Sequence, residues 1–268
     1  MELRKKFKVT NVRLILIITV VSALLAGTIL FFIIRNVRKE EPRTRIPDFV
    51  QDIKTENITD KKDRYNIEIK YPVTARNKIN EEIKGYVDHK IEEFLSNIKA
   101  EEDGEIRANE EAGETADEGT TGTIPEYKLF IDFIAYEYSE DIVSFKLDAY
   151  EFTGGTRENK YVKTYIYNIY SNKLMGIGDI LTGNFEKALS DICKEQLKSK
   201  MGEYYDEVLV TQGAGPKREN FEKCVLDKDM LTIFFEPYSV GPWDAGEQSC
   251  EISYLSLTAF LNEAILKK

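Results

Sequence analysis

Residues 221–257, FEKCVLDKDMLTIFFEPYSVGPWDAGEQSCEISYLSL, contain the alternation that decides the fold class. In Leu231–Glu236 every second residue is apolar, which predicts a strand with one fully apolar face. Cys250–Tyr254 repeats this period of two. Between them, Pro237–Glu247 is rich in aromatic residues, glycine and proline; we call this segment the crossing. The stretch therefore predicts an antiparallel hairpin, a tight crossing and a third strand.

Outward from this stretch, the same two periods indicate the other elements. Apolar residues at three- and four-residue steps predict helices at about Ala75–Lys99 and Asn184–Met201, with a short helix at Leu257–Leu266. The period of two predicts four more strands: Arg64–Tyr71, Tyr127–Tyr138, Ile142–Phe152 and Tyr161–Tyr170. Since no βαβ unit repeats, we expect an α+β fold. Its sheet is mainly antiparallel, with two longer helices and a short C-terminal helix packed on it.

A single transmembrane helix is expected to precede this fold. Leu14–Ile34 runs for 21 residues without a charge, enough to cross a hydrocarbon core of about 30 Å. It is longer than the apolar part of a cleaved signal peptide, about 7–15 residues. Five lysines and arginines precede the span and five follow it closely, so charge leaves the orientation open. We expect residues 1–13 in the cytoplasm and the folded part outside.

The chain after the span divides by composition. Residues 35–61 are charged, contain Pro42 and Pro47, and predict a tether. Residues 62–268 form the predicted folded domain. Within it, residues 100–124 predict a disordered acidic insertion, because Glu101–Glu118 holds nine acids and one base.

Composition argues against several classes of function. The formal net charge of −10 disfavours binding to nucleic acid or anionic lipid. The only histidine, His89, has no serine or cysteine arrangement near it in sequence, so a nucleophilic hydrolase is not expected. No phosphate loop and no metal-ligand spacing is present, so we expect no catalytic residues, cofactor or metal.

The three cysteines, Cys193, Cys224 and Cys250, leave two alternatives. In an oxidising compartment Cys224 and Cys250 can pair, because both lie on strands of the same predicted sheet. Otherwise all three are separate buried thiols, which pack as small apolar groups.

Four segments carry a resemblance to a known family. The extracytoplasmic domain shared by RsiV-type anti-sigma factors and PdaC-type peptidoglycan deacetylases resembles YPVTARNKINEEIKGYVDHKIEEF (71–94), YEFTGGTRENKYVKTYIYNIYSNKLMGIGDIL (150–181), GAGPKRENFEKCVL (213–226) and LTIFFEPYSVGPWDAGEQSCEISYLSL (231–257). That family's Gly-Gly-Ala-His turn corresponds here to Gly154, Gly155, Thr156 and Arg157, so a role of that histidine does not carry over. No deacetylase domain and no anti-sigma segment is recognisable beside it.

The resemblance implies a membrane-anchored, extracytoplasmic binding or sensing domain of the cell envelope, without enzyme activity. In such domains the ligand is a protein such as lysozyme, or peptidoglycan. Arg157, Tyr238 and Trp243 are the candidate contact residues, since arginine and aromatic residues are enriched at binding hot spots. The alternative for the two aromatic residues is that they pack the crossing onto the sheet. Two other functions stay open: a structural membrane protein whose domain contacts partner subunits, and a carboxylate-based envelope hydrolase with two close acids, one of raised pKa.

Overall fold

The computed structural model describes residues 53–111, 126–154 and 156–266, which all lie within one compact unit, Ile46–Lys268. The predicted membrane span, Leu14–Ile34, lies outside the described residues. Among the residues that are described, no helix combines the length and the apolar character needed to cross a bilayer.

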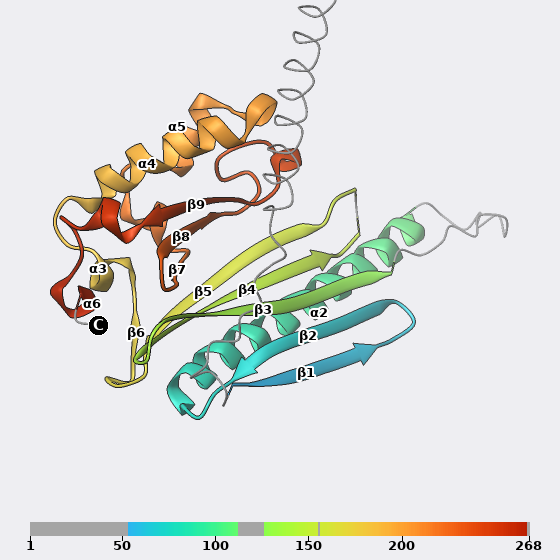
Figure 1. The fold of residues 1–268 in the computed structure, drawn as a ribbon. Coiled ribbons are helices and arrows are strands. Elements are labelled where there is room, and N and C mark those ends of the chain that lie inside the picture. Colours follow the sequence, from blue (N-terminus) through green and yellow to red (C-terminus); the bar gives the residue numbers. More distant parts are fainter. Residues whose placement is uncertain (1–52, 112–125, 155, 267–268) are drawn as a thin grey trace, which may run out of the picture. The chain divides into compact units, whose positions relative to one another are not determined.

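A six-stranded sheet forms the larger layer of this unit (Figure 1). Its strands follow one another in chain order: β1 (Lys54–Lys61), β2 (Tyr65–Val73), β3 (Tyr127–Ser139), β4 (Ile142–Phe152), β5 (Asn159–Asn168) and β6 (Lys173–Met175). All neighbouring pairs are antiparallel except β2 and β3, which run parallel. The sheet is therefore mixed.

Helix α2 (Asn77–Glu111) explains the parallel pair, because parallel neighbours need a long crossover connection. It leaves β2 and returns the chain to the start of β3, lying along one face of the sheet (Figure 1). Ile79, Ile83, Val87 and Phe94 on this helix are fully buried, as the predicted apolar stripe requires. Fully burying one such side chain contributes about 1.5–3 kcal/mol.

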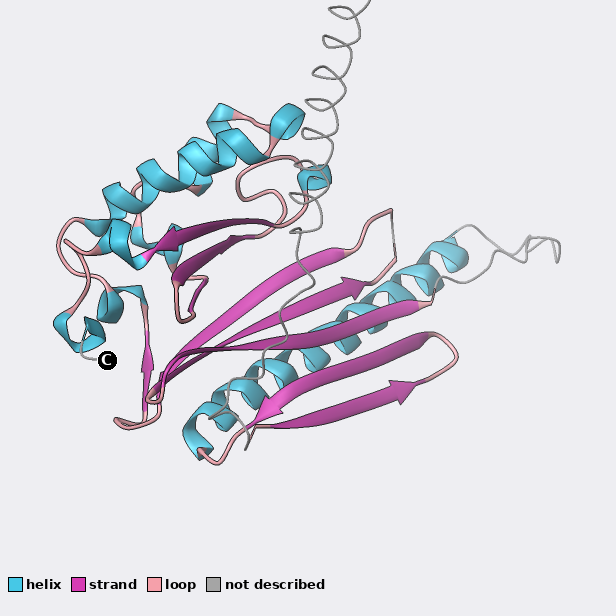
Figure 2. Cartoon of the chain, viewed as in Figure 1, coloured by secondary structure: helices cyan, strands magenta, loops and turns pink. Residues whose placement is uncertain are grey.

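A second layer follows in the chain and contains the three-stranded antiparallel sheet β7 (Cys224–Leu226), β8 (Met230–Phe235) and β9 (Gln248–Ser253). Helix α4 (Phe185–Lys200) covers it (Figure 2), burying Leu189, Cys193 and Leu197 in a shared core. The remaining helices are short: α3 (Ile177–Ile180), α5 (Glu207–Gly213) and α6 (Glu263–Leu266), with 3-10 turns η2 (Gly202–Tyr204), η3 (Arg218–Phe221), η4 (Trp243–Ala245) and η5 (Tyr254–Leu257).

The two sheets meet on the face of β4 and β5 that points away from α2. The hydroxyl of Ser144 accepts a hydrogen bond from the amide of Leu226 (3.0 Å), and that of Thr164 accepts one from the amide of Cys224 (3.1 Å). Val162, Val225 and Phe234 form a small buried cluster between the layers. Tyr136 of β3 packs against the same cluster. The open part of this face holds a pocket lined by residues of β1, β2 and the Phe130–Asp132 part of β3.

The structure corrects the predicted architecture in three places. The predicted tether includes Lys54–Lys61, which instead form β1 and pair with β2. The predicted disordered insertion begins at residue 100, but α2 continues to Glu111, since its glutamates and alanines are good helix formers. The strands after Cys224 belong to a sheet of their own rather than to a single large one.

Candidate functional site

The three predicted contact residues come together in space. Arg157 lies in the turn between β4 and β5, whereas Tyr238 and Trp243 lie in the crossing between β8 and β9. The guanidinium carbon of Arg157 is 4.9 Å from the centroid of the Trp243 ring, a cation–π contact. Its Nη1 donates a hydrogen bond to the Tyr238 hydroxyl (3.1 Å). Arg157 thus links both aromatic residues, although their contact with a ligand stays a prediction.

The crossing presents Tyr238 to solvent through an uncommon backbone conformation. Tyr238 has φ of 69° and its side chain is 61% exposed. Left-handed backbone at a residue with a Cβ costs roughly 1–2 kcal/mol. The amide of Ser239 donates to the carbonyl of Glu236 (3.0 Å), which closes the turn around Tyr238. Tyr238 therefore does not pack the crossing onto the sheet, contrary to the alternative considered for it.

Two carboxylates fasten the crossing to the six-stranded sheet. Before it, Glu236 accepts a hydrogen bond from the amide of Val162 on β5 (2.6 Å) and pairs with Lys223. At its end, Glu247 pairs with the buried ammonium of Lys146 on β4 (2.9 Å). The same ammonium contacts Asp148 (2.5 Å). The aromatic residues of the crossing are thereby held at a fixed place over β4 and β5.

The cluster of Lys146, Asp148 and Glu247 bears on the hydrolase alternative. Burial raises the pKa of Glu247, while the hydrogen bond from Lys146 opposes this rise. Burial favours loss of the proton from Lys146, but the bonds to Asp148 and Glu247 outweigh it and raise the Lys146 pKa. The ammonium of Lys146 thus bridges the two acids. The arrangement is that of an ion-pair cluster that joins two layers.

A pocket of about 520 Å³ opens beside Trp243 and Arg157. Its other lining residues are Glu126, Lys128, Phe152, Thr156 and Glu158. The lining offers aromatic rings, one hydroxyl and charges of both signs, and contains no histidine or cysteine. Within the described part of the chain, no cluster of histidine, cysteine, aspartate or glutamate is arranged to hold a metal ion. The pocket is suited to holding a polar ligand against an aromatic surface.

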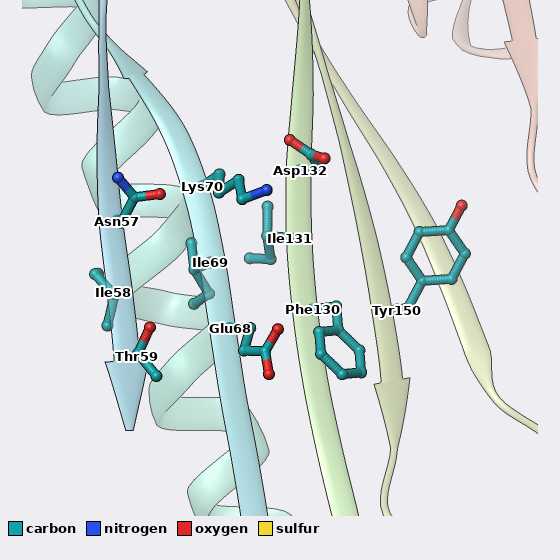
Figure 3. A pocket seen from close by; sticks show the side chains of 10 residues that line it. All are labelled: Asn57, Ile58, Thr59, Glu68, Ile69, Lys70, Phe130, Ile131, Asp132 and Tyr150. Carbon is teal, nitrogen blue, oxygen red and sulfur yellow. The ribbon is translucent and has the colours of Figure 1, made fainter. Parts of the chain in front are cut away.

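A second pocket, of about 340 Å³, lies on the open face of the same sheet. Figure 3 shows the side chains that line it, with α2 behind the strands. The polar and aromatic members are Asn57, Thr59, Glu68, Lys70, Phe130, Asp132 and Tyr150. Sequence analysis did not select them, yet one signal was present: Phe130 alternates with Leu129 and Ile131 and so falls on the polar face.

Of the two alternatives for the cysteines, the structure has the separate buried thiols: Cys193, Cys224 and Cys250 are all free and buried, and Cys224 and Cys250 are not paired. Both residues lie opposite Ile233 of β8, one on each side of it. Two strand spacings separate them by about 10 Å, whereas disulfide-bonded Cα atoms are about 4.4–6.8 Å apart. Cys250 lies instead against α4, with its sulfur 3.6 Å from the carbonyl oxygen of Cys193.

Comparisons with solved structures identify the fold. The fold is that of two solved DUF3298 family proteins, from Bacteroides fragilis (TM-score 0.55, 20% identity) and Pseudomonas aeruginosa (TM-score 0.53, 14% identity). Each match covers 81% of this chain, and 95% and 98% of the respective solved chains.

The family models divide the chain in two. Residues 58–160 match the model described as deacetylase PdaC, and residues 178–255 match the protein of unknown function DUF3298. The peptidoglycan-N-acetylmuramic acid deacetylase PdaC of Bacillus subtilis is 24% identical over 246 residues, which cover 90% of this chain and 49% of that protein. The chain thus spans about half the length of this relative. The resemblance to the PdaC-type domain is confirmed: a segment that matches the PdaC model is followed by one that matches the DUF3298 model.

Proposed function

We propose that this chain is a glycan-binding domain of the cell envelope, with its ligand site at the pocket beside Arg157 and Trp243. The observation that carries the proposal is that Arg157 contacts both Tyr238 and Trp243 from a distant segment, and that Arg157 and Trp243 line a pocket. Sugar rings have apolar C–H faces that pack on aromatic rings, and hydroxyl and amide groups that bond charged side chains. The lining supplies both kinds of partner.

Peptidoglycan is the glycan that the comparisons favour. The Bacillus subtilis relative carries peptidoglycan in its name. The pocket contains the cations of Lys128 and Arg157, which suit the carboxylate of an acidic amino sugar. We propose a binding role rather than catalysis, because Lys146 bridges Glu247, at the end of the crossing, and Asp148 in an ion-pair cluster. On this proposal Leu14–Ile34 anchors the chain in the cell membrane, with residues 1–13 in the cytoplasm and the domain outside.

The single tryptophan gives a direct test, since Trp243 is the only one in the chain and lines the pocket. The full-length chain in mild detergent is titrated with a soluble muropeptide disaccharide while tryptophan fluorescence is recorded. We expect a saturable change that is weakened about tenfold in the Arg157→Ala variant. A flat titration, with no heat of binding by calorimetry, contradicts the proposal.

A basic protein such as lysozyme is the second candidate ligand. The net charge of −10 favours it, because opposite charges steer association and complement each other at an interface. This candidate predicts binding that weakens strongly as salt rises, whereas glycan stacking on aromatic rings is only weakly dependent on salt. Titration with catalytically inactive lysozyme at low and raised salt distinguishes the two ligands. A structural role in contacting partner subunits remains the third candidate if neither binds.

A further inference from the structure

The sheet-face pocket of Figure 3 lies on the same face of the six-stranded sheet as the Trp243 pocket. Ile58, Ile69 and Ile131 line the bottom of the sheet-face pocket and pack toward α2. Side chains alternate along a strand, so Glu68, Phe130 and their polar neighbours point to the opposite side. This is also the side on which the crossing is fastened, through Lys146 of β4.

Strand register makes the two pockets neighbours. Phe130 of β3 is paired with Tyr150 of β4, and both line the sheet-face pocket. Lys128 is paired with Phe152, and both line the pocket of Trp243. The two pairs are two residues apart on the same face, a step of about 7 Å along the strands. Adjacent pairs of one ladder therefore line the two pockets, which are neighbours on this face. We call the two pockets together the groove, and each of them one half of it.

The chemistry of the sheet-face half matches that of the Trp243 half. Phe130 and Tyr150 provide a cross-strand aromatic pair, and Tyr150 is 37% exposed. The ammonium of Lys160 lies 5.2 Å from the centroid of the Tyr150 ring. Around this pair stand an amide, a hydroxyl, one ammonium and two carboxylates, from Asn57, Thr59, Lys70, Glu68 and Asp132.

The mixture of charges narrows the class of ligand. A polyanion such as a nucleic acid or an anionic lipid surface calls for clustered basic side chains, and neither half of the groove has them. Aromatic faces interleaved with short polar groups fit a ligand that repeats an apolar ring face and polar substituents. A linear polysaccharide of N-acetylated sugars has this repeat.

We infer that the sheet-face pocket is a second subsite, so that one linear glycan lies along β3 and β4 from Asp132 to Trp243. This inference rests on the proposed function of the Trp243 pocket. It adds that the affinity depends on the length of the glycan. Two linked subsites make the second contact intramolecular, so affinity rises with ligand length until both are filled.

The test titrates the full-length chain with β-1,4-linked N-acetylglucosamine oligomers, from disaccharide to hexasaccharide, and follows Trp243 fluorescence. We expect the hexasaccharide to bind at least about tenfold more tightly than the disaccharide. In a Tyr150→Ala variant this gain is lost, while disaccharide affinity stays within about twofold. Tyr150 lies on the surface, so its truncation spares the core.

The matched control is Tyr170→Ala, since Tyr170 is also an exposed tyrosine (87%) but lies in the turn after β5 and outside both pockets. It is expected to keep the full gain with length. If the disaccharide binds but length brings no gain, or if Tyr150→Ala keeps the gain, the second subsite is wrong and the Trp243 site stands. If no oligomer and no muropeptide binds, both proposals are overturned together.

Discussion

The ammonium of Lys146 lies 2.9 Å from Oε1 of Glu247, although 101 residues separate the two in sequence. Lys146 is only 6% exposed and stands on β4, while Glu247 is the last residue of the crossing. The pair therefore connects the layer that carries Trp243 with the layer that carries the sheet-face pocket. Asp148 completes the cluster on the β4 side.

Replacing Lys146 by methionine is predicted to destabilise the protein by about 2–3 kcal/mol, because two partly buried carboxylates lose their counter-ion. The loss depends on pH. Without the ammonium, nothing offsets the burial that raises the pKa of Glu247. A carboxyl whose folded-state pKa is raised costs stability as pH rises above its unfolded pKa. Urea unfolding is therefore expected to show a larger loss at about pH 8 than at about pH 5.

Lys187→Met is the control for this prediction, since Lys187 forms an exposed pair with Asp191 on α4. Such pairs contribute about 0.5 kcal/mol or less. An equal loss at both pH values for Lys146→Met would show that packing, not charge, holds the two layers at this point.

Replacing Arg157 by alanine is predicted to free Trp243 and Tyr238 from each other while leaving the fold intact. The guanidinium contacts the Trp243 ring and the Tyr238 hydroxyl at the surface, and an exposed cation–π contact contributes about 0.5–1 kcal/mol. We expect a changed emission maximum for Trp243 and a loss of stability below about 1 kcal/mol. Arg76→Ala, at an exposed position before α2, serves as the control and is expected to leave the emission unchanged.

Gly213, at the end of α5, is predicted not to accept a side chain. A Cβ placed there would lie 1.8 Å from the carbonyl oxygen of Ser239, the residue after Tyr238. Gly213→Ala is therefore expected to displace the crossing, to cost about 2 kcal/mol of stability and to weaken ligand binding at Trp243.

Gly85→Ala is expected to have the opposite effect on stability. Gly85 lies inside α2 with no atom within 4 Å of an added Cβ, so alanine should stabilise the protein by about 0.5–1 kcal/mol. Thermal unfolding of the two variants side by side checks both predictions. Similar melting temperatures for the two would contradict the close approach at Ser239.

The cysteines are predicted to stay reduced, because Cys224 and Cys250 lie on either side of Ile233 and are too far apart to pair. Burial raises the pKa of the Cys224 thiol, and the bond with Cys250 together with burial raises that of Cys193. Raised thiol pKa values slow alkylation. Mass spectrometry after alkylation is expected to show no label on the native protein and three labels after unfolding without reductant. A Cys224–Cys250 peptide would contradict the register of β7 to β9.

Periodicity predicted most elements because it reports burial. The stripe of Ile79, Ile83, Val87 and Phe94 gave α2, and alternation gave β3, β4 and β8. Strand β1 was missed because seven of its eight residues are polar, as suits an edge strand. The parallel pair was missed because a single crossover leaves no repeated pattern in the sequence.

The candidate site was predicted in residue type but not in geometry. Arg157 and Trp243 were chosen as side chains that favour binding, and only tertiary structure places residues 86 positions apart in contact. The sequence did not indicate the Lys146 cluster, since Ser144, Lys146 and Asp148 share one face of the strand and three polar residues there are typical of a solvated face. Its burial comes from the second sheet, which sequence periodicity does not position.

Tyr238 is held in left-handed backbone conformation, where glycine would sit without strain. A Tyr238→Gly variant would therefore fold more stably and lose the phenol that Arg157 contacts. Selection for heat resistance alone would erase this part of the surface, whereas selection for the ligand would keep it. In a library of variants, screening for stability would therefore select glycine at position 238, and screening for ligand binding would select tyrosine. The residue at position 238 thus indicates whether a related chain keeps the proposed binding function.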